Sequence, residues 1–362
     1  MAKDFMAAMQ TSLDLTRGGD LMAATRAIQA ALGAPAAVPD VEPAPSAVLP
    51  QRTAPRDVED AEIVGETPPR RARAPLGETL RGLRPRKRAD GPDLAPGARL
   101  ERRRQVTAHG ARAVRLHVPA SVRAEGAAGL IVMLHGCGQD PDDFARGTGM
   151  DRLGEAHRLV MVWPGQDRSA NAQNCWTWFE PGQTGRAGEA AIIAEIARDL
   201  GAEFGVPEGR TFVAGLSAGG AMAAAVAAGY PEVFAAAGVH SGLAPGSARD
   251  LTSAFAAMRG DGAAHQAGPT RPVILFHGDA DRTVAPAAAD WALRGVDGVT
   301  SERRDGAVRH AGRTADGHPV EVWRIAGAGH AWSGGDPAGS YAVASGPDAS
   351  AQMVRFFLAL GG

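Results

Sequence analysis

The stretch Thr211-Phe212-Val213-Ala214-Gly215-Leu216-Ser217-Ala218-Gly219 decides the fold class of this chain. Its first part is apolar, as in a buried strand, and the run of small residues over 220–229 favours a helix. A G-x-S-x-G sequence between a strand and a helix predicts a sharp turn that exposes the serine hydroxyl. Glycines are needed there because a Cβ would collide with the neighbouring backbone. Ser217 would also begin a helix, whose free N–H groups can face an anion, so we predict that Ser217 is a nucleophile.

A serine nucleophile needs a histidine to take its proton and an acid to orient that histidine. The buried-strand pattern at 271–276 runs into a polar loop that carries Asp279 and Asp281. The alternating pattern at 320–325 runs into a loop of small residues that ends at His330. His330 is therefore the candidate base. The spacing from the strand end permits either aspartate as the orienting acid.

A third loop offers a backbone donor for the oxyanion. The apolar run 130–134 is typical of a strand covered on both faces in a parallel sheet. It leads into His135-Gly136-Cys137-Gly138-Gln139, an HG loop of the kind that donates a backbone N–H in esterases and lipases. We expect the N–H groups of Cys137 and Ala218 to form the oxyanion hole.

Other segments extend the alternation of strands and helices. Strand patterns occur at 113–119, 159–163 and 235–240, and helix patterns at 189–204, 287–294 and 347–360. Such alternation predicts an α/β fold with a mostly parallel sheet and helices on both faces. The active-site loops should then meet at the carboxyl ends of the strands.

Five short motifs occur in order along the chain, at 134–139, 174–179, 215–219, 277–284 and 329–335. The set resembles the PHB depolymerase family of esterases, and the match runs from about residue 105 to the C-terminus. The resemblance implies an α/β-hydrolase fold and carboxylesterase activity on 3-hydroxyalkanoate esters. It also implies a triad of Ser217, Asp281 and His330, because Asp281 takes the acid position of the family's H-G-x-x-D-x-x-V pattern.

Three tryptophans are candidates for substrate contact. Trp176 and Trp178 lie in one motif, and Trp332 follows His330 by two residues. An aliphatic ester offers mainly apolar surface for recognition, so we expect these rings to line the cleft, although a place in the core is the alternative.

Two further hypotheses about function stay open. One is an acetyl or feruloyl esterase of the same fold that acts on polysaccharide, and the other is a granule-associated binding protein. An intact order of serine, aspartate and histidine argues against the second. The chain has no phosphate loop and no HExxH motif, so we expect neither a cofactor nor a metal. The two cysteines, Cys137 and Cys175, form either a disulfide or two reduced thiols.

The first third of the chain differs in kind from the rest. Residues 1–33 predict a helical hairpin, residues 34–104 a disordered linker rich in Pro and Arg, and residues 105–362 the catalytic domain. The apolar stripes of the hairpin fit the catalytic domain itself or a polymer granule surface. The basic stretch at 84–88 lacks interleaved aromatic residues, so we expect no nucleic-acid partner.

Composition limits what can be said about the core, the partners and the location of the protein. A hydrophobic fraction of 44% suffices for a core, and a formal net charge of −2 says little about partners. There is no apolar stretch of 18 residues and no apolar core of a signal peptide near the start, so we expect no transmembrane segment and a cytoplasmic location. Secretion, as in much of the family, is the alternative.

Overall fold

The computed structural model of the protein describes residues 94–261 and 267–360. The expected hairpin at 1–33, its granule contact and the expected linker up to residue 93 lie outside these residues.

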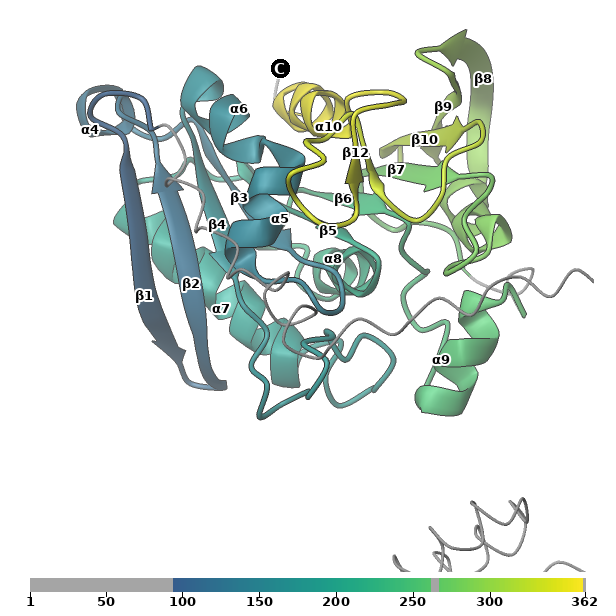
Figure 1. The fold of residues 1–362 in the computed structure, drawn as a ribbon, viewed down its shortest axis with the longest axis horizontal. Helices are drawn as coiled ribbons and strands as arrows, with labels where there is room; N and C mark the ends of the chain where they lie inside the picture. The colour runs from purple at the N-terminus through teal and green to yellow at the C-terminus, as the bar shows by residue number, and fades with distance from the viewer. Residues whose placement is uncertain (1–93, 262–266, 361–362) are drawn as a thin grey trace, which may run out of the picture. The chain divides into compact units, whose positions relative to one another are not determined.

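Ten strands of the described residues form one sheet in the order β1-β2-β4-β3-β5-β6-β7-β10-β9-β8 (Figure 1). The six strands from β4 to β10 in that order pair in parallel, while the two strands at either edge pair antiparallel. The strands are β1 (Arg99–Thr107), β2 (Gly110–Val118), β3 (Gly129–Leu134), β4 (Leu159–Pro164), β5 (Thr211–Leu216), β6 (Ala236–His240), β7 (Val273–Gly278), β8 (Val296–Arg304), β9 (Ala307–Thr314) and β10 (Pro319–Ile325). The short strands β11 (Trp332–Ser333) and β12 (Ala342–Val343) pair separately.

Helices cover both faces of the sheet (Figure 1). They are α4 (Val122–Glu125), α5 (Pro141–Thr148), α6 (Met150–His157), α7 (Gly188–Glu203), α8 (Ala218–Gly229), α9 (Leu251–Met258), the 3₁₀ helix η2 (Pro286–Leu293) and α10 (Ala349–Leu358). Residues of α7 and α8 belong to one apolar core, and residues of α5, α6 and α10 belong to a second.

Strand β3 shows why two cores form. Leu130, Val132 and Leu134 pack in the core with α7 and α8, while Ile131 and Met133 pack in the other. Successive side chains of a strand point to opposite faces, so a continuous apolar run supplies both cores at once. The expected α/β-hydrolase architecture, a mostly parallel sheet between two layers of helices, is confirmed.

The edges of the sheet differ from the expectation. Strand β1 begins at Arg99, inside the stretch expected to be linker, and pairs along its whole length with β2. Its arginines suggested a solvated linker, but on the edge strand two of them pair with helices: Arg102 lies 2.7 Å from Asp142 of α5, and Arg103 lies 2.7 Å from Glu203 of α7. Strands β8 and β9 were not expected, because β8 is almost wholly exposed and carries no apolar alternation. The helix expected at 287–294 is the 3₁₀ helix η2.

No helix in the described ranges combines the length and apolar character that crossing a membrane requires.

Candidate active site

Ser217 occupies a strained turn between β5 and α8. Its backbone has φ 57° and ψ −120°, a conformation that non-glycine residues rarely adopt. A Cβ on Gly215 would lie 2.4 Å from the Gly219 carbonyl, and one on Gly219 would lie 2.0 Å from the Leu134 oxygen. The two glycines therefore allow β5, α8 and the end of β3 to approach closely, and the serine side chain is left partly exposed at the carboxyl end of β5.

Asp281 and His330 lie close together at the carboxyl ends of two neighbouring strands. Asp281 follows β7 and His330 follows β10, and these strands are parallel neighbours. The Nδ1 of His330 lies 2.7 Å from Oδ2 of Asp281. The hydroxyl of Ser217 has no hydrogen-bond partner within the described residues, so the structure joins the expected acid and base but shows no bond from the serine to the histidine. Apo active sites often have such open geometry.

Asp281 is held as a carboxylate by its surroundings. Its Oδ1 accepts the backbone N–H groups of Thr283 at 2.8 Å and Val284 at 2.9 Å. Burial opposes the charge, but the hydrogen bond with His330, its charge and these two amides outweigh burial and hold the pKa of Asp281 below its ordinary value. A charged Asp281 can fix the His330 tautomer and stabilise an imidazolium.

Asp279 has a different role in the loop. Its Oδ1 accepts the backbone N–H of Gly327 at 2.6 Å, which ties the loop after β7 to the loop that carries His330. Of the two aspartates that the spacing permits, the structure places Asp281 against the histidine.

The segment 135–139, which we call the oxyanion loop, lies against the turn of Ser217. A Cβ on Gly219 would be 2.5 Å from the His135 carbonyl oxygen, so the two loops are in contact. Among the described residues, the backbone N–H groups of Cys137 and Ala218 donate to no oxygen. Ala218 is the first residue of α8, where N–H groups have no partner within the helix. Both expected oxyanion donors are therefore free.

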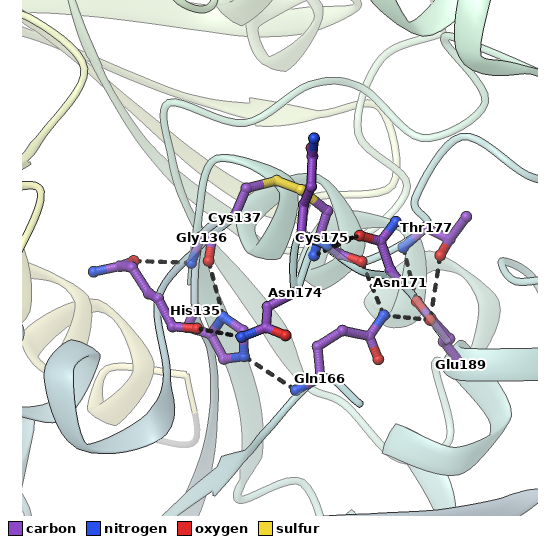
Figure 2. The surroundings of a disulfide bond; sticks show 11 residues. His135, Gly136, Cys137, Gln166, Asn171, Asn174, Cys175, Thr177 and Glu189 are labelled. Carbon is purple, nitrogen blue, oxygen red and sulfur yellow. Dashed lines mark hydrogen bonds between the residues drawn. A yellow bond between two sulfur atoms is a disulfide. The ribbon is translucent and has the colours of Figure 1, made fainter. Parts of the chain in front are cut away.

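A disulfide joins Cys137 of the oxyanion loop to Cys175, with Cα atoms 4.3 Å apart (Figure 2). This answers the question that the sequence left open about the two cysteines. The bond fixes the oxyanion loop to the segment between β4 and α7.

A buried polar network supports the same loop (Figure 2). His135 is bonded through Nδ1 to the Gly136 carbonyl at 2.9 Å, and its Nε2 accepts the Gln166 backbone N–H at 3.1 Å. The Gln166 amide donates to the Cys175 carbonyl and to Glu189, which also accepts from Thr177. Burial lowers the pKa of His135, so it is neutral and shapes the loop.

Gln166 and Glu189 were not predicted from the sequence. The one available signal was the position of Glu189, a carboxylate directly before the apolar residues 190–194 of α7.

Two other histidines close to the site are structural. His240 is stacked between Trp332 and Phe276, and its Nε2 accepts the Ser333 N–H at 3.1 Å. Burial lowers its pKa to about 3. The Nε2–H of His277 donates to the Val284 carbonyl at 3.0 Å and lies 3.5 Å from Oδ2 of Asp281, so His277 supports the acid loop.

The depressed pKa of His240 predicts a pH dependence of stability. The unfolded chain binds a proton near pH 6.5 that folded His240 binds only near pH 3, so stability falls as pH drops through this window. For a His240→Gln variant we expect the slope of unfolding free energy against pH, between pH 5 and 6, to be smaller by about 1.4 kcal/mol per unit. Urea unfolding of both proteins at several pH values measures the slopes. Equal slopes would mean that His240 is protonated in the folded protein.

The tryptophans do not form the expected cleft wall. Trp176 and Trp332 have no exposed surface and Trp178 is 7% exposed, so these rings pack in the core. Trp332 makes an edge contact with Phe144 and donates its Nε1–H to Ser350 at 3.0 Å. Their place in the motifs did not reveal their burial, because it depends on distant elements: Trp332 packs in the core with α5 and α10, and Trp176 and Trp178 pack in the core with α7 and α8.

The part of the chain that the structure describes contains no group of three or more His, Cys, Asp or Glu side chains placed to hold a metal ion.

Comparisons with known proteins find relatives that are described as esterases or depolymerases. The model of the family described as "Esterase PHB depolymerase" matches residues 112–318. The poly(3-hydroxyalkanoate) depolymerase C of Paucimonas lemoignei is 34% identical over 238 residues, which are 59% of this chain and 57% of that protein. A feruloyl esterase B of Neurospora crassa is 32% identical over 32% of this chain and 39% of its own length. The chain thus spans well under two thirds of the length of these relatives.

Among solved structures, an acetyl xylan esterase from Aspergillus awamori superposes with a TM-score of 0.52 at 20% identity. The superposition covers 64% of this chain and 94% of that one, and it supports the fold. The family match extends over more than half of the sequence and includes the turn of Ser217, the oxyanion loop and Asp281. The chain therefore belongs to the esterase PHB depolymerase family.

Proposed function

We propose that this protein is a serine carboxylesterase that hydrolyses 3-hydroxyalkanoate esters through Ser217, His330 and Asp281. The observation that carries the proposal is the bond between His330 and a charged, buried Asp281, at the carboxyl ends of the strands, where Ser217 is partly exposed in a strained turn. A pairing of acid and histidine that converges on an exposed serine is the arrangement required for nucleophilic attack on an ester.

The geometry supports a two-step reaction. The Ser217 oxygen attacks the ester carbonyl carbon while Nε2 of His330 takes its proton, since Nδ1 is bonded to Asp281. The resulting oxyanion accepts hydrogen bonds from the free N–H groups of Cys137 and Ala218. His330 returns the proton to the leaving alcohol, and an acyl group stays on Ser217. Water, deprotonated by His330, then releases the acid and restores the serine.

The choice of 3-hydroxyalkanoate esters rests on similarity. The family and the Paucimonas lemoignei relative are both described by poly(3-hydroxyalkanoate) or PHB depolymerisation. Esters of polysaccharide are the second candidate, because feruloyl and acetylxylan esterases are also among the relatives.

Substrate profiling tests the proposal. We expect purified protein to release 3-hydroxybutyrate from soluble oligomers or amorphous poly(3-hydroxybutyrate), and to hydrolyse p-nitrophenyl butyrate. Acetylated xylan and methyl ferulate in parallel reactions test the second candidate. Turnover of those two substrates with no release of 3-hydroxybutyrate would reject the first candidate in favour of the second.

A further inference from the structure

A cleft of about 590 Å³ opens between the segment that follows β4 and the start of α9. Its volume lies within the range of roughly 300–1,000 Å³ that is usual for small-molecule sites. The lining includes Arg112, Asn171, Phe179, Gln183, Arg249 and Leu251. We call it the donor-lined cleft, because several of its side-chain hydrogen-bond donors have no partner among the described residues.

The acceptor atoms of this cleft are mostly occupied. Oδ1 of Asn171 accepts from the N–H groups of Gln173 and Cys175, and Oε1 of Gln183 accepts from the N–H of Glu189. The carboxylate of Asp250 caps α9 through Ser253, and that of Glu189 is held by Thr177 and Gln166. The exceptions are the exposed carboxylate of Glu180 and Oδ2 of Asp250, because the bonds from Ser253 use only Oδ1.

Several side-chain N–H donors of the cleft have no hydrogen-bond acceptor among the described residues. Arg112 is 7% exposed, and its buried Nε–H has no partner among the described residues. The same part of the chain supplies no acceptor for the side-chain N–H groups of Asn171, Gln183 and Arg249. A buried donor without a partner is costly, so it points to a ligand or water that presents an acceptor.

The walls of the cleft, like the turn of Ser217, come from segments that follow the carboxyl ends of strands. One wall follows the carboxyl end of β4 and the other follows the carboxyl end of β6, while the turn of Ser217 follows β5. The disulfide joins the first wall to the oxyanion loop, because Cys175 is two residues before Thr177, which lines the cleft (Figure 2). A long substrate held at Ser217 can therefore extend toward the cleft.

We propose that the donor-lined cleft is a subsite for the chain of an oligomeric ester, and that its side chains donate hydrogen bonds to ester carbonyl oxygens remote from the bond that is cleaved. Each repeat of an oligo(3-hydroxyalkanoate) carries acceptors and an alkyl group but no donor. Phe179 and Leu251, which is 58% exposed, offer apolar contact to the alkyl groups. A saccharide would bring hydroxyl donors, for which the free carboxylate oxygens of the cleft are those of Glu180 and Oδ2 of Asp250. The inference rests on the proposed function and specifies its substrate.

Two substitutions test the subsite without touching the triad. Asn171→Asp keeps the Oδ1 that binds the loop amides and replaces the free donor with an acceptor, and Arg249→Gln removes an exposed guanidinium. We expect each to lower kcat/KM for the 3-hydroxybutyrate trimer roughly tenfold, through KM, because a hydrogen bond from a charged or well-aligned donor is lost. The kcat/KM for p-nitrophenyl butyrate, which has no second ester unit to occupy the cleft, should not change.

Matched controls make the same charge changes outside the lining. Arg168→Gln and Gln173→Glu alter exposed residues of the same segment and should leave both substrates unaffected. Parallel losses on both substrates, or no loss on the trimer, would overturn the subsite.

A binding experiment distinguishes failure of this inference from failure of the proposed function. Calorimetric titration of the trimer into Ser217→Ala protein should show binding that Asn171→Asp weakens. That result would support the subsite even if wild-type protein failed to cleave the trimer, which would reject the proposed substrate. No binding of the trimer to Ser217→Ala protein would overturn the subsite itself.

Discussion

Replacing Ser217 with alanine should lower kcat on p-nitrophenyl butyrate by roughly four to six orders of magnitude. The loss is large because the histidine and the acid have no function without the nucleophile, and the residual rate comes only from binding and the oxyanion donors. The folded structure should survive, since the serine hydroxyl has no partner within the described residues. Alanine at the strained φ of 57° should even leave the turn unchanged, because the surrounding chain holds it.

Covalent labelling of the serine tests the same assignment. A serine-directed phosphonate should label wild-type protein at Ser217, as identified by peptide mass spectrometry, and should not label Ser217→Ala. Ser345→Ala, which removes an exposed serine hydroxyl elsewhere, is the matched control and should keep full activity and labelling. If Ser217→Ala retained a tenth of wild-type turnover, the serine mechanism would be wrong.

The sequence predicted those parts of the site that depend on local structure. The turn of Ser217 follows from five consecutive residues, and the free N–H of Ala218 follows from its place at the start of a helix. The buried strands of the central sheet could be located, because continuous apolar runs can be recognised without knowing their neighbours.

The remaining parts depend on contacts between distant segments. Gln166, His135 and Glu189 come from three elements, and no local pattern brings them together. The burial of Trp332 depends on α5 and α10, so the sequence could place it near His330 without showing that it is covered. The edge strand β1 was missed because its charged side chains resemble a linker until its partner β2 is known.

The choice between Asp279 and Asp281 also depends on contacts between distant segments. Both lie in one polar loop, and the spacing from β7 permits either, so the expectation came from the resemblance to a family pattern. The structure adds the pairing of β7 with β10, which sets the loop of His330 beside Asp281, and the hydrogen bond of Asp279 to Gly327.

This arrangement predicts that Asp281→Asn will lower kcat by roughly 10⁴-fold, whereas Asp279→Asn will cost far less. An amide at position 281 cannot stabilise the imidazolium, and its NH₂ group can hold His330 in the wrong tautomer. It also loses the negative charge that the amides of Thr283 and Val284 favour. Asp279→Asn keeps an oxygen that can accept the Gly327 N–H, so its loop should remain in place.

The two asparagine variants are matched, because each makes the same isosteric change in one loop, two residues apart. Comparing kcat and KM for p-nitrophenyl butyrate separates the roles: Asp281→Asn should lower kcat with little change in KM, and thermal unfolding should show that both variants are folded. An acid that orients the base acts in the transition state, so its loss must appear in kcat. A larger loss of kcat for Asp279→Asn would assign the orienting role to Asp279 and make the bond between Asp281 and His330 a structural contact. Equal losses in the two variants would contradict the assignment of that role to Asp281 alone.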